Sequence, residues 1–351
     1  MAVSGGRKTR EITKAHRIDE AALTAYLKEH MSGIGEKITL RQFPIGQSNP
    51  TYLIVSNDKK YVLRKKPPGK LLPSAHAIDR EYKVIRALKG SDVPVPNALH
   101  LCENTDVIGT EFFIMEMIEG RVFHDPGLPG MTTEDRYQYF DNYIRILAKL
   151  HSIDIEAVGL SQFGRPNGYL ERQVMRWASQ YEASKTESIP AMDRIIDWLP
   201  KNLPEDNSIS IVHGDYRPGN TITHAKKPTI LAILDWELST LGHPLADLGY
   251  CCAAYHGKIS SVGDFSLLNH RKLGIPTQEE FVRKYCEYSG RTEIKDVSYY
   301  VIFSLFRSAA IIQGVYKRGI NGNASSEQAL MFGEMAKARA ISAWKLVEAN
   351  Y

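Results

Sequence analysis

The chain has 351 residues, with 44 lysine and arginine residues against 40 aspartate and glutamate residues, so its formal net charge is +4. At roughly 150 residues per domain, this length predicts two domains or lobes with a buried core. A hydrophobic content of 43% and a charged content of 24% are typical of a soluble globular protein. They exclude a largely disordered chain, a collagen-like chain and a disulfide-stabilised mini-protein. The net charge is too small for this length to indicate a nucleic-acid partner.

Three features of the sequence bear on where the protein acts. Residues 1–10 are rich in glycine, serine, lysine and arginine and have no apolar core, so we predict no secretory signal. They are typical of a flexible basic tail, with a weak organelle-targeting role as the alternative. The most apolar stretch, residues 299–316, carries Arg307 and Gln313 and is short for a bilayer, which predicts a buried helix. The four cysteines form no C-x-x-C pair, which favours buried thiols in a reducing compartment. We therefore expect a cytoplasmic protein.

The beginning of the chain predicts a small antiparallel sheet with one helix. Short apolar runs at 51–55 and 60–64 flank the sequence SNDK, which is typical of the turn in a β-hairpin. Residues 111–118 form a further expected strand. Residues 75–89 carry apolar side chains three and four positions apart, which predicts a helix between the strands.

Helices dominate the rest of the chain. A helix opens near residue 133 and keeps one apolar face as far as residue 151. Further helices are expected at 169–183, 192–199, 278–289, 297–316 and 326–348. Within this part, residues 208–236 contain short β-branched runs and a turn, which predicts a hairpin. The expected fold class is α+β, with a small antiparallel-sheet lobe at 1–118 and a larger, mainly helical lobe at 119–351.

Three polar side chains are expected at the ends of that hairpin. Asp215 lies in the loop HGDYRPGN after an apolar strand, Asn220 ends the loop, and Asp235 ends the next apolar run. Phosphoryl transfer needs one carboxylate that accepts the proton of the attacking hydroxyl. It also needs an amide and a second carboxylate that hold Mg²⁺ against the phosphates. Asp and Asn are also common turn and cap residues, but the combination of all three favours phosphoryl transfer.

A buried acidic residue is expected on the helix that follows the hairpin strands. Glu81 has apolar neighbours three and four positions away on either side, so it lies on the apolar face and needs a partner. Arg64, on the preceding strand, is the candidate, because a strand cation paired with a helix glutamate positions nucleotide phosphates in kinases. The alternative is that Glu81 lies at the edge of the apolar face and contacts water.

Six motifs follow one another along nearly the whole chain. They are GQSNPTY (46–52), YVLRKKPPGKLLPSAH (61–76), DREY (79–82), FIMEMIEG (113–120), HGDYRPGN (213–220) and LDWELSTLGHPLADLGY (234–250). With these motifs the chain resembles the aminoglycoside/choline phosphotransferase branch of the protein-kinase-like fold. Within it, the chain is similar to the kinase-like domain fused to acyl-CoA dehydrogenases (family members ten and eleven) and to its stand-alone bacterial relatives. The resemblance implies a nucleotide-binding lobe at 1–118 and a catalytic and substrate-binding lobe at 119–351.

The resemblance also implies an ATP- and Mg²⁺-dependent kinase that phosphorylates a hydroxyl of a small molecule. It assigns Asp215 as the catalytic base, Asn220 and Asp235 as Mg²⁺ ligands, and Arg64 with Glu81 as the pair that positions the phosphates. The other implied contacts are the loop over the phosphates at Gly46, Ser48 and Asn49, backbone groups at Glu116 and Met117 on the adenine edge, and Arg217 at the γ-phosphate. Asp247 resembles a residue that braces the catalytic loop; the alternative is an ordinary helix cap.

The chain departs from the usual protein-kinase pattern in four places. Arg64 stands where most kinases have a lysine, and the nucleotide loop has one glycine, Gly46, rather than three. Glu237 replaces the glycine of the metal-binding triplet, and no A-P-E sequence of an activation loop is present. These departures argue against a regulated protein kinase.

The acceptor is open between several classes of molecule. Residues 57–90 contain ten lysines and arginines against three acids, an excess larger than ATP alone requires, although a solvated surface has the same pattern. With the resemblance, this excess points to a hydroxyacyl-CoA; an aminoglycoside, as a polycation, would need an acidic pocket. The alternatives are a choline or aminoglycoside kinase, a protein kinase, and a catalytically weak nucleotide-binding protein. No nucleic-acid or membrane partner is expected, and the oligomeric state is left open.

Overall fold

The computed structural model describes residues 9–13, 16–44, 49–67, 77–165, 167–257, 264–266, 268–322 and 327–351. The chain divides into two compact units. Unit 1 comprises Met1–Val122, Glu156–Leu160 and Asn220–Ser239, and unit 2 comprises Phe123–Ile155, Ser161–Gly219 and Thr240–Tyr351. The lobe boundary expected after residue 118 stays a prediction.

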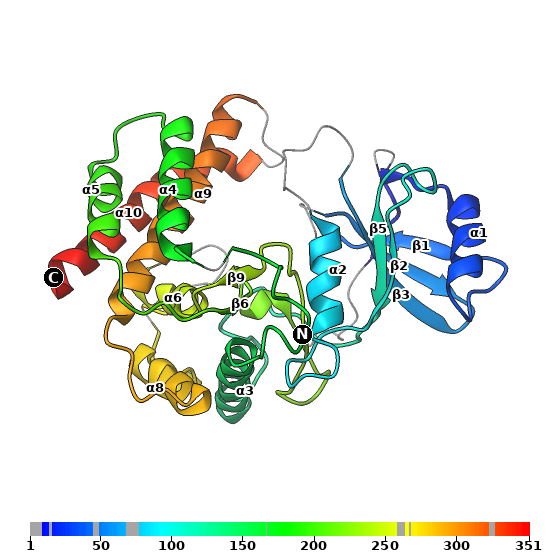
Figure 1. Ribbon diagram of the computed structural model, residues 1–351, viewed down its shortest axis with the longest axis horizontal. Coiled ribbons are helices and arrows are strands. Elements are labelled where there is room, and N and C mark those ends of the chain that lie inside the picture. The colour runs from blue at the N-terminus through cyan, green and yellow to red at the C-terminus, as the bar shows by residue number, and fades with distance from the viewer. Residues whose placement is uncertain are drawn as a thin grey trace. The chain divides into compact units, whose positions relative to one another are not determined.

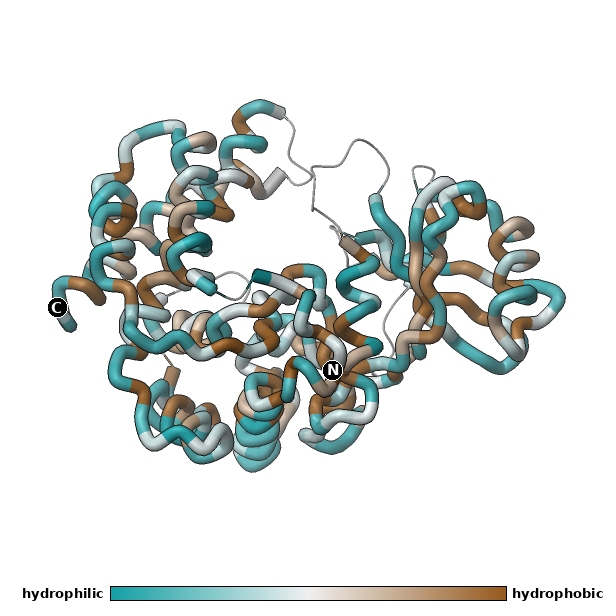
Figure 2. The backbone as a smooth tube through the Cα atoms, viewed as in Figure 1, coloured by the Kyte–Doolittle hydropathy of each residue, from teal (hydrophilic) through white to brown (hydrophobic). Residues whose placement is uncertain are grey.

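Unit 1 is built on an antiparallel sheet whose described strands run in the order β1-β2-β3-β5-β4 (Figure 1). The strands are β1 (Thr39–Gln42), β2 (Thr51–Ser56), β3 (Lys59–Lys65), β4 (Ala98–Cys102) and β5 (Phe112–Glu116). The expected β2–β3 hairpin is present, and its turn places Asn57 at a left-handed φ of 52°, a conformation that Asn tolerates better than most residues. Hydrophobic residues follow the strands along their length (Figure 2).

The two faces of this sheet are covered by two different helices. On one face, Tyr52, Ile54 and Leu63 pack in one apolar cluster with residues of α1 (Glu20–His30). On the other face lies α2 (Ile78–Ala87), whose Tyr82 ring centre is 6.0 Å from that of Phe113 (Figure 1). The sequence predicted only α2. The helix α1 is short and buries few apolar residues, so its periodicity is weak.

The expected hairpin of short strands also belongs to unit 1. It consists of β7 (Thr221–Thr223) and β8 (Ile230–Ile233), which pair antiparallel. Its backbone is hydrogen-bonded to the rest of the unit: the Arg121 N–H donates to the carbonyl of Thr223 at 2.7 Å, and the Ile233 N–H donates to that of Pro94 at 2.8 Å. These bonds fix the hairpin within the same unit as α2 and β3.

Unit 2 is mainly helical. Its helices are α3 (Thr133–His151), α4 (Tyr169–Ser184), α5 (Pro190–Trp198), α6 (Leu245–Cys252), α7 (His270–Leu273), α8 (Gln278–Ser289), α9 (Val297–Ile320) and α10 (Phe332–Asn350). A short ladder pairs β6 (Ser210–Val212) with β9 (Thr240–Gly242). The predicted helices are present with ends shifted by a few residues, and the short helices α6 and α7 were not predicted. A small antiparallel sheet with a mainly helical partner is the kinase-like α+β architecture that the sequence predicts.

The apolar stretch around residues 299–316 is the buried core helix that the sequence predicts. It forms most of α9, which packs against α4, α6 and α10, and its apolar side chains are largely buried. Within the part of the chain that the structure describes, no helix combines the length and the apolar character that crossing a bilayer requires. All four cysteines are free and buried, as expected.

Candidate active site

The carboxylate of Asp215 is held from both of its oxygens within unit 2. The loop that carries it follows β6, and the Tyr250 hydroxyl on α6 donates to Oδ1 at 2.6 Å. The Nε of Arg217 donates to Oδ2 at 3.0 Å. The side chain of Asp215 retains 23% exposure, so it is oriented by protein groups and still open to a ligand.

Asp247 fixes the loop that carries Asp215. It lies in the first turn of α6 and is buried, and its two oxygens accept the N–H groups of His213 at 2.6 Å and Gly214 at 2.9 Å. Burial acts to raise the pKa of Asp247, but the bonds from His151 and the His213 backbone outweigh it, so the net pKa is lowered. The bracing role is therefore present in the structure, and the helix-cap alternative is not.

A pair of tyrosines joins the loop to α3: Tyr216 belongs to the loop and Tyr143 to the helix. The Tyr216 hydroxyl donates to the carbonyl of Tyr143 at 2.8 Å, and the Tyr143 hydroxyl donates to the carbonyl of Tyr216 at 2.9 Å. Both rings are buried, with centres 4.4 Å apart. The backbone next to Asp215 is therefore fixed on both sides, which pre-organises the carboxylate.

In unit 1, one guanidinium bridges two carboxylates. Arg64 of β3 contacts Glu81 of α2 at 3.1 Å through Nη1, and Asp235 at 3.1 Å through Nη2. Glu81 is 1% exposed, so the alternative that it contacts water is wrong. Burial raises the pKa of Glu81 to about 7 although Arg64 opposes the shift. Burial acts to lower the pKa of Arg64, but the neighbouring carboxylates outweigh it and raise it.

Asn220 and Asp235 lie at the open end of the β7–β8 hairpin. The N–H of Leu234 donates to the carbonyl of Asn220 at 2.8 Å, which places the residues next to each other across the hairpin. Asp235 has a φ of 67°, a strained conformation for a non-glycine residue that is concentrated at functional sites. Its side chain is 32% exposed and can reach a ligand.

Asn220 and Asp235 fit a magnesium ion that also binds substrate phosphates and water better than they fit a metal bound only by protein side chains. Among the described residues, no group of three or more His, Cys, Asp or Glu side chains could hold a metal. Mg²⁺ is usually bound by one or two carboxylates, with substrate phosphates and water completing the shell. The Asp235 carboxylate with the Asn220 amide matches that donor set. The convergence of Asp215 with these groups stays a prediction.

The residues expected to contact the nucleotide are only partly described. Gly46 and Ser48 lie outside the described residues. Asn49 is fully buried, and its Nδ2 donates to Glu237 at 2.9 Å. Glu237, the residue that departs from the kinase triplet, therefore joins the segment expected to cover the phosphates to the segment that carries Asp235. The Oδ1 of Asn49 has no hydrogen-bond partner in the described part of the chain.

One backbone group named in the adenine-edge prediction is already hydrogen-bonded within unit 1. Glu116 ends β5, and its N–H donates to the carbonyl of Asn97 at 2.9 Å. Its carboxylate also accepts the side-chain amide of Asn97 at 2.6 Å. The N–H of Glu116 is therefore already bonded, and the expected contact passes to its carbonyl or to Met117.

Two residues beside Asp215 were missed by the sequence analysis of function. Tyr250 follows Asp247 by three positions, so both project from the same side of α6, and this spacing was the available signal. Arg307 was noted only as a charge within an apolar stretch. Its Nη2 donates to the carbonyl of Gly214 at 2.9 Å.

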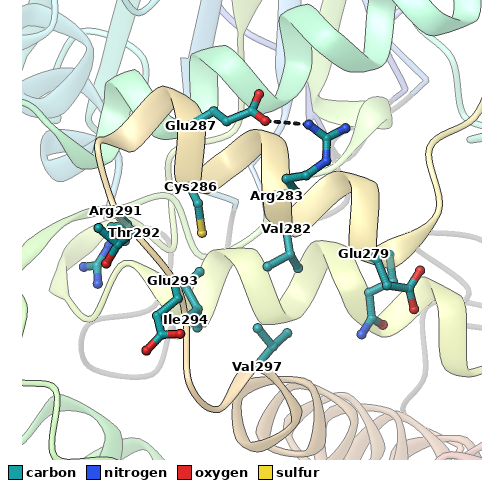
Figure 3. Close-up of a pocket in the computed structure, with 11 residues that line it drawn as sticks. Glu279, Val282, Arg283, Cys286, Glu287, Arg291, Thr292, Glu293, Ile294 and Val297 are labelled. Carbon is teal, nitrogen blue, oxygen red and sulfur yellow. Dashed lines mark hydrogen bonds and ion pairs between the residues drawn. The ribbon is translucent and has the colours of Figure 1, made fainter.

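A surface cavity of about 480 Å³ lies elsewhere in unit 2 (Figure 3). Its walls come from α8 and from the segment between α8 and α9, with Val282, Cys286 and Val297 among the lining residues. None of the predicted site residues lines it, so this cavity is separate from the loop that carries Asp215.

Comparison with known proteins identifies the family. A model of the phosphotransferase enzyme family matches residues 39–288. Acyl-CoA dehydrogenase family member 10 from Mus musculus is 46% identical over 346 residues, which are 97% of this chain and 32% of that protein. Family member 11 from Homo sapiens is 40% identical over 351 residues, which are 97% of this chain and 44% of that protein. The chain thus spans less than half the length of these relatives.

Solved structures give the same result. A candidate aminoglycoside phosphotransferase from Ralstonia eutropha is 43% identical, with a TM-score of 0.86 over 95% of this chain and 99% of that one. A GDP complex of an aminoglycoside 2'-phosphotransferase is 14% identical, with a TM-score of 0.65 over 93% of this chain and 100% of that one, and it shares the fold alone. The expected resemblance is confirmed. The chain belongs to the phosphotransferase enzyme family and has the kinase-like fold of the aminoglycoside phosphotransferases.

Proposed function

We propose that the chain is an ATP- and Mg²⁺-dependent kinase that transfers the γ-phosphate to a hydroxyl of a small molecule. Asp215 accepts the proton of the attacking hydroxyl. Asn220 and Asp235 hold the magnesium ion, which neutralises charge on the phosphates when bound. Arg64, kept in place by Glu81, positions the phosphates. The cytoplasmic location stays a prediction.

Arg217 has two tasks in this proposal. In the structure its Nε is bonded to Oδ2 of Asp215, the oxygen that would otherwise accept a proton. Arg217 donates instead to the γ-phosphate when ATP is bound, because a guanidinium offers several donors and binds phosphate strongly. Its departure frees Oδ2 for the acceptor hydroxyl, while Tyr250 keeps Oδ1.

The observation that carries the proposal is the position of Arg64 between Glu81 and Asp235, with both contacts at 3.1 Å. The buried cation Arg64 contacts two carboxylates, although one would be enough to neutralise its charge. This joins the phosphate-positioning pair to the expected metal ligand. The same guanidinium thus contacts the acid expected to hold it in place and an acid expected to bind Mg²⁺.

For the acceptor we propose a hydroxyacyl-CoA. Nearly all of this chain aligns with proteins named acyl-CoA dehydrogenase family members. Their names support an acyl-CoA as the acceptor. In addition, two cations lie at the Asp215 loop: Arg217, which belongs to it and bonds Asp215, and Arg307, which bonds the carbonyl of Gly214. Cations at this position disfavour a polycationic aminoglycoside.

The test is phosphorylation of a metabolite library that contains hydroxyacyl-CoA esters, choline, an aminoglycoside and a peptide mixture. We expect ATP consumption with hydroxyacyl-CoA, which Asp215→Ala abolishes. Asp197→Asn, an exposed acid on α5 that pairs with Lys201, serves as the matched control and retains activity. Turnover of choline alone would contradict hydroxyacyl-CoA as the acceptor, and turnover of peptides alone would favour a protein kinase. ATP binding without any turnover would contradict the proposal that the chain is an enzyme.

A further inference from the structure

We propose that Arg307 is an acceptor-binding residue that hydrogen-bonds the acyl oxygen of a hydroxyacyl acceptor, next to the hydroxyl that is phosphorylated. The acyl oxygen belongs to a carboxylate in a free hydroxy acid and to a carbonyl in its thioester. The inference rests on the proposed function and adds the contact that distinguishes an acyl acceptor from a plain alcohol.

The position of Arg307 carries the first part of the argument. It lies in the middle of α9, and its Nη2 donates at 2.9 Å to the carbonyl of Gly214. Gly214 directly precedes Asp215. The guanidinium is therefore fixed beside the base by a single hydrogen bond, while the rest of its five donors remain for other partners.

The missing counter-charge of Arg307 is the second part. Within the described ranges, the carbonyl of Gly214 is its only hydrogen-bond acceptor, and no carboxylate forms an ion pair with it. Its Nε is buried without a partner. A half-buried guanidinium without a carboxylate is costly, since buried charges are normally paired. A ligand oxygen that arrives with the substrate would supply the missing partner.

The surroundings of Arg307 favour an electron-rich group. Its guanidinium lies 5.6 Å from the ring centre of Trp177 on α4, and the guanidinium of Arg176 lies 5.4 Å from the same ring. The helix α9 contains no Asp or Glu over its 24 residues. Two cations around one indole ring, on helices that pack together, attract an anionic or carbonyl oxygen and repel a polycation.

An acyl group fits this position better than a second phosphate of the nucleotide. Arg64 and Arg217 already serve the triphosphate in the proposed function. In a hydroxyacyl chain the acyl carbon is only a few bonds from the hydroxyl, so one short molecule reaches both Asp215 and a group fixed at Gly214. The planar guanidinium matches a carboxylate with two hydrogen bonds and a thioester carbonyl with one.

The experiment compares three acceptors built on the best acyl substrate of the library: the CoA thioester, the free hydroxy acid, and the diol in which the acyl carbon is reduced. Arg307→Met is expected to raise the KM for the two acyl acceptors about tenfold or more. The KM for the diol and the Kd of ATP should stay nearly unchanged. The thioester and free-acid arms show which acyl oxygen is bound. Arg318 is an exposed cation on the same helix, so Arg318→Met is the matched control. It should change neither the KM values of the acceptors nor the Kd of ATP.

Arg307→Lys keeps the charge and loses the forked geometry, so it should show a smaller KM change and remains usable if Arg307→Met does not fold. Equal losses for the diol and the acyl acceptors, or a loss in kcat alone, would mean that Arg307 only braces Gly214 and would overturn the inference. A best substrate without an acyl oxygen would overturn it as well. If no acceptor consumes ATP in the wild type, the proposed function itself fails.

Discussion

The Tyr250 hydroxyl donates a 2.6 Å hydrogen bond to Oδ1 of Asp215, and this bond joins α6 to the expected catalytic base. Asp247 lies on the same helix and accepts hydrogen bonds from the N–H groups of His213 and Gly214. The helix α6 therefore holds both the loop and the carboxylate that the loop carries. The first prediction follows from this geometry.

Tyr250→Phe should lower kcat by about tenfold, because a hydrogen bond to a charged group contributes roughly 1.5 kcal/mol to holding Asp215 in place. The KM for ATP should change little. Steady-state kinetics with the preferred acceptor measure both. Tyr288→Phe is the matched control, since the Tyr288 hydroxyl also donates to an aspartate at 2.6 Å, Asp141, which is not an expected site residue. An unchanged kcat in Tyr250→Phe, or equal losses in the two variants, would contradict a positioning role.

Asp247→Asn should impair activity and stability together. The asparagine amide cannot accept both backbone N–H groups, so one buried donor loses its partner at a cost of about 2 kcal/mol. Urea unfolding should show that loss, and kcat should fall by about a hundredfold because the loop no longer fixes Asp215. A stable variant with full activity would show that the two hydrogen bonds do not hold the loop.

The Arg64–Glu81 pair should be energetically coupled in nucleotide binding. Arg64→Ala should raise the KM for ATP at least about tenfold, because Glu81 then stays buried without its cation and a phosphate contact is lost. Glu81→Gln should have a smaller effect, since the neutral amide keeps the packing. A double-mutant cycle on ATP binding should give a coupling of about 1 kcal/mol or more. Additive effects would indicate that the two side chains act independently.

The acid sensitivity of unit 2 should depend on His243. This side chain is 3% exposed, its Nε2 is 3.0 Å from the carbonyl of Asp206, and the Tyr300 hydroxyl is 3.3 Å away. Burial lowers the pKa of His243 to about 4, although Asp206 opposes the shift and Arg291 adds to it. As the pH falls, the unfolded chain therefore protonates this histidine at a higher pH than the folded chain does. The folded state keeps its full stability above about pH 6.5, and it loses stability as the pH falls from there toward 4.

The corresponding measurement is the free energy of unfolding at pH 7 and pH 5. It should fall by roughly 2 kcal/mol more in the wild type than in His243→Gln, which lacks the titrating group. An equal fall in both proteins would assign the acid sensitivity to other groups.

Local signals made part of the fold predictable. The helix α8 agrees with the expected range 278–289 because Thr277 and Glu280 form a capping box before it and Gly290 ends it at a φ of 71°. The β2–β3 hairpin was predictable from the two short apolar runs and from the turn sequence SNDK between them, which contains Asn57. The Arg64–Glu81 contact was predictable too, because both residues lie in regular elements whose periodicity places their side chains.

Other features depend on contacts that no short segment encodes. The helix α1 is held by the apolar face of the sheet more than by its own pattern. The contact of Arg64 with Asp235 joins residues 171 positions apart, and the bond of Asn49 to Glu237 joins residues 188 positions apart. The Tyr250–Asp215 bond depends on how α6 packs against the loop that carries Asp215, and this packing forms only when the chain folds.

The most direct test of the central claim is phosphate transfer by Asp215→Asn at saturating ATP and Mg²⁺, followed by ³¹P NMR of the product. The wild type should give a phosphate ester on the acceptor hydroxyl. The variant should bind ATP with unchanged affinity yet transfer phosphate at least about a hundredfold more slowly. Ester formation at the wild-type rate by the variant would contradict the account.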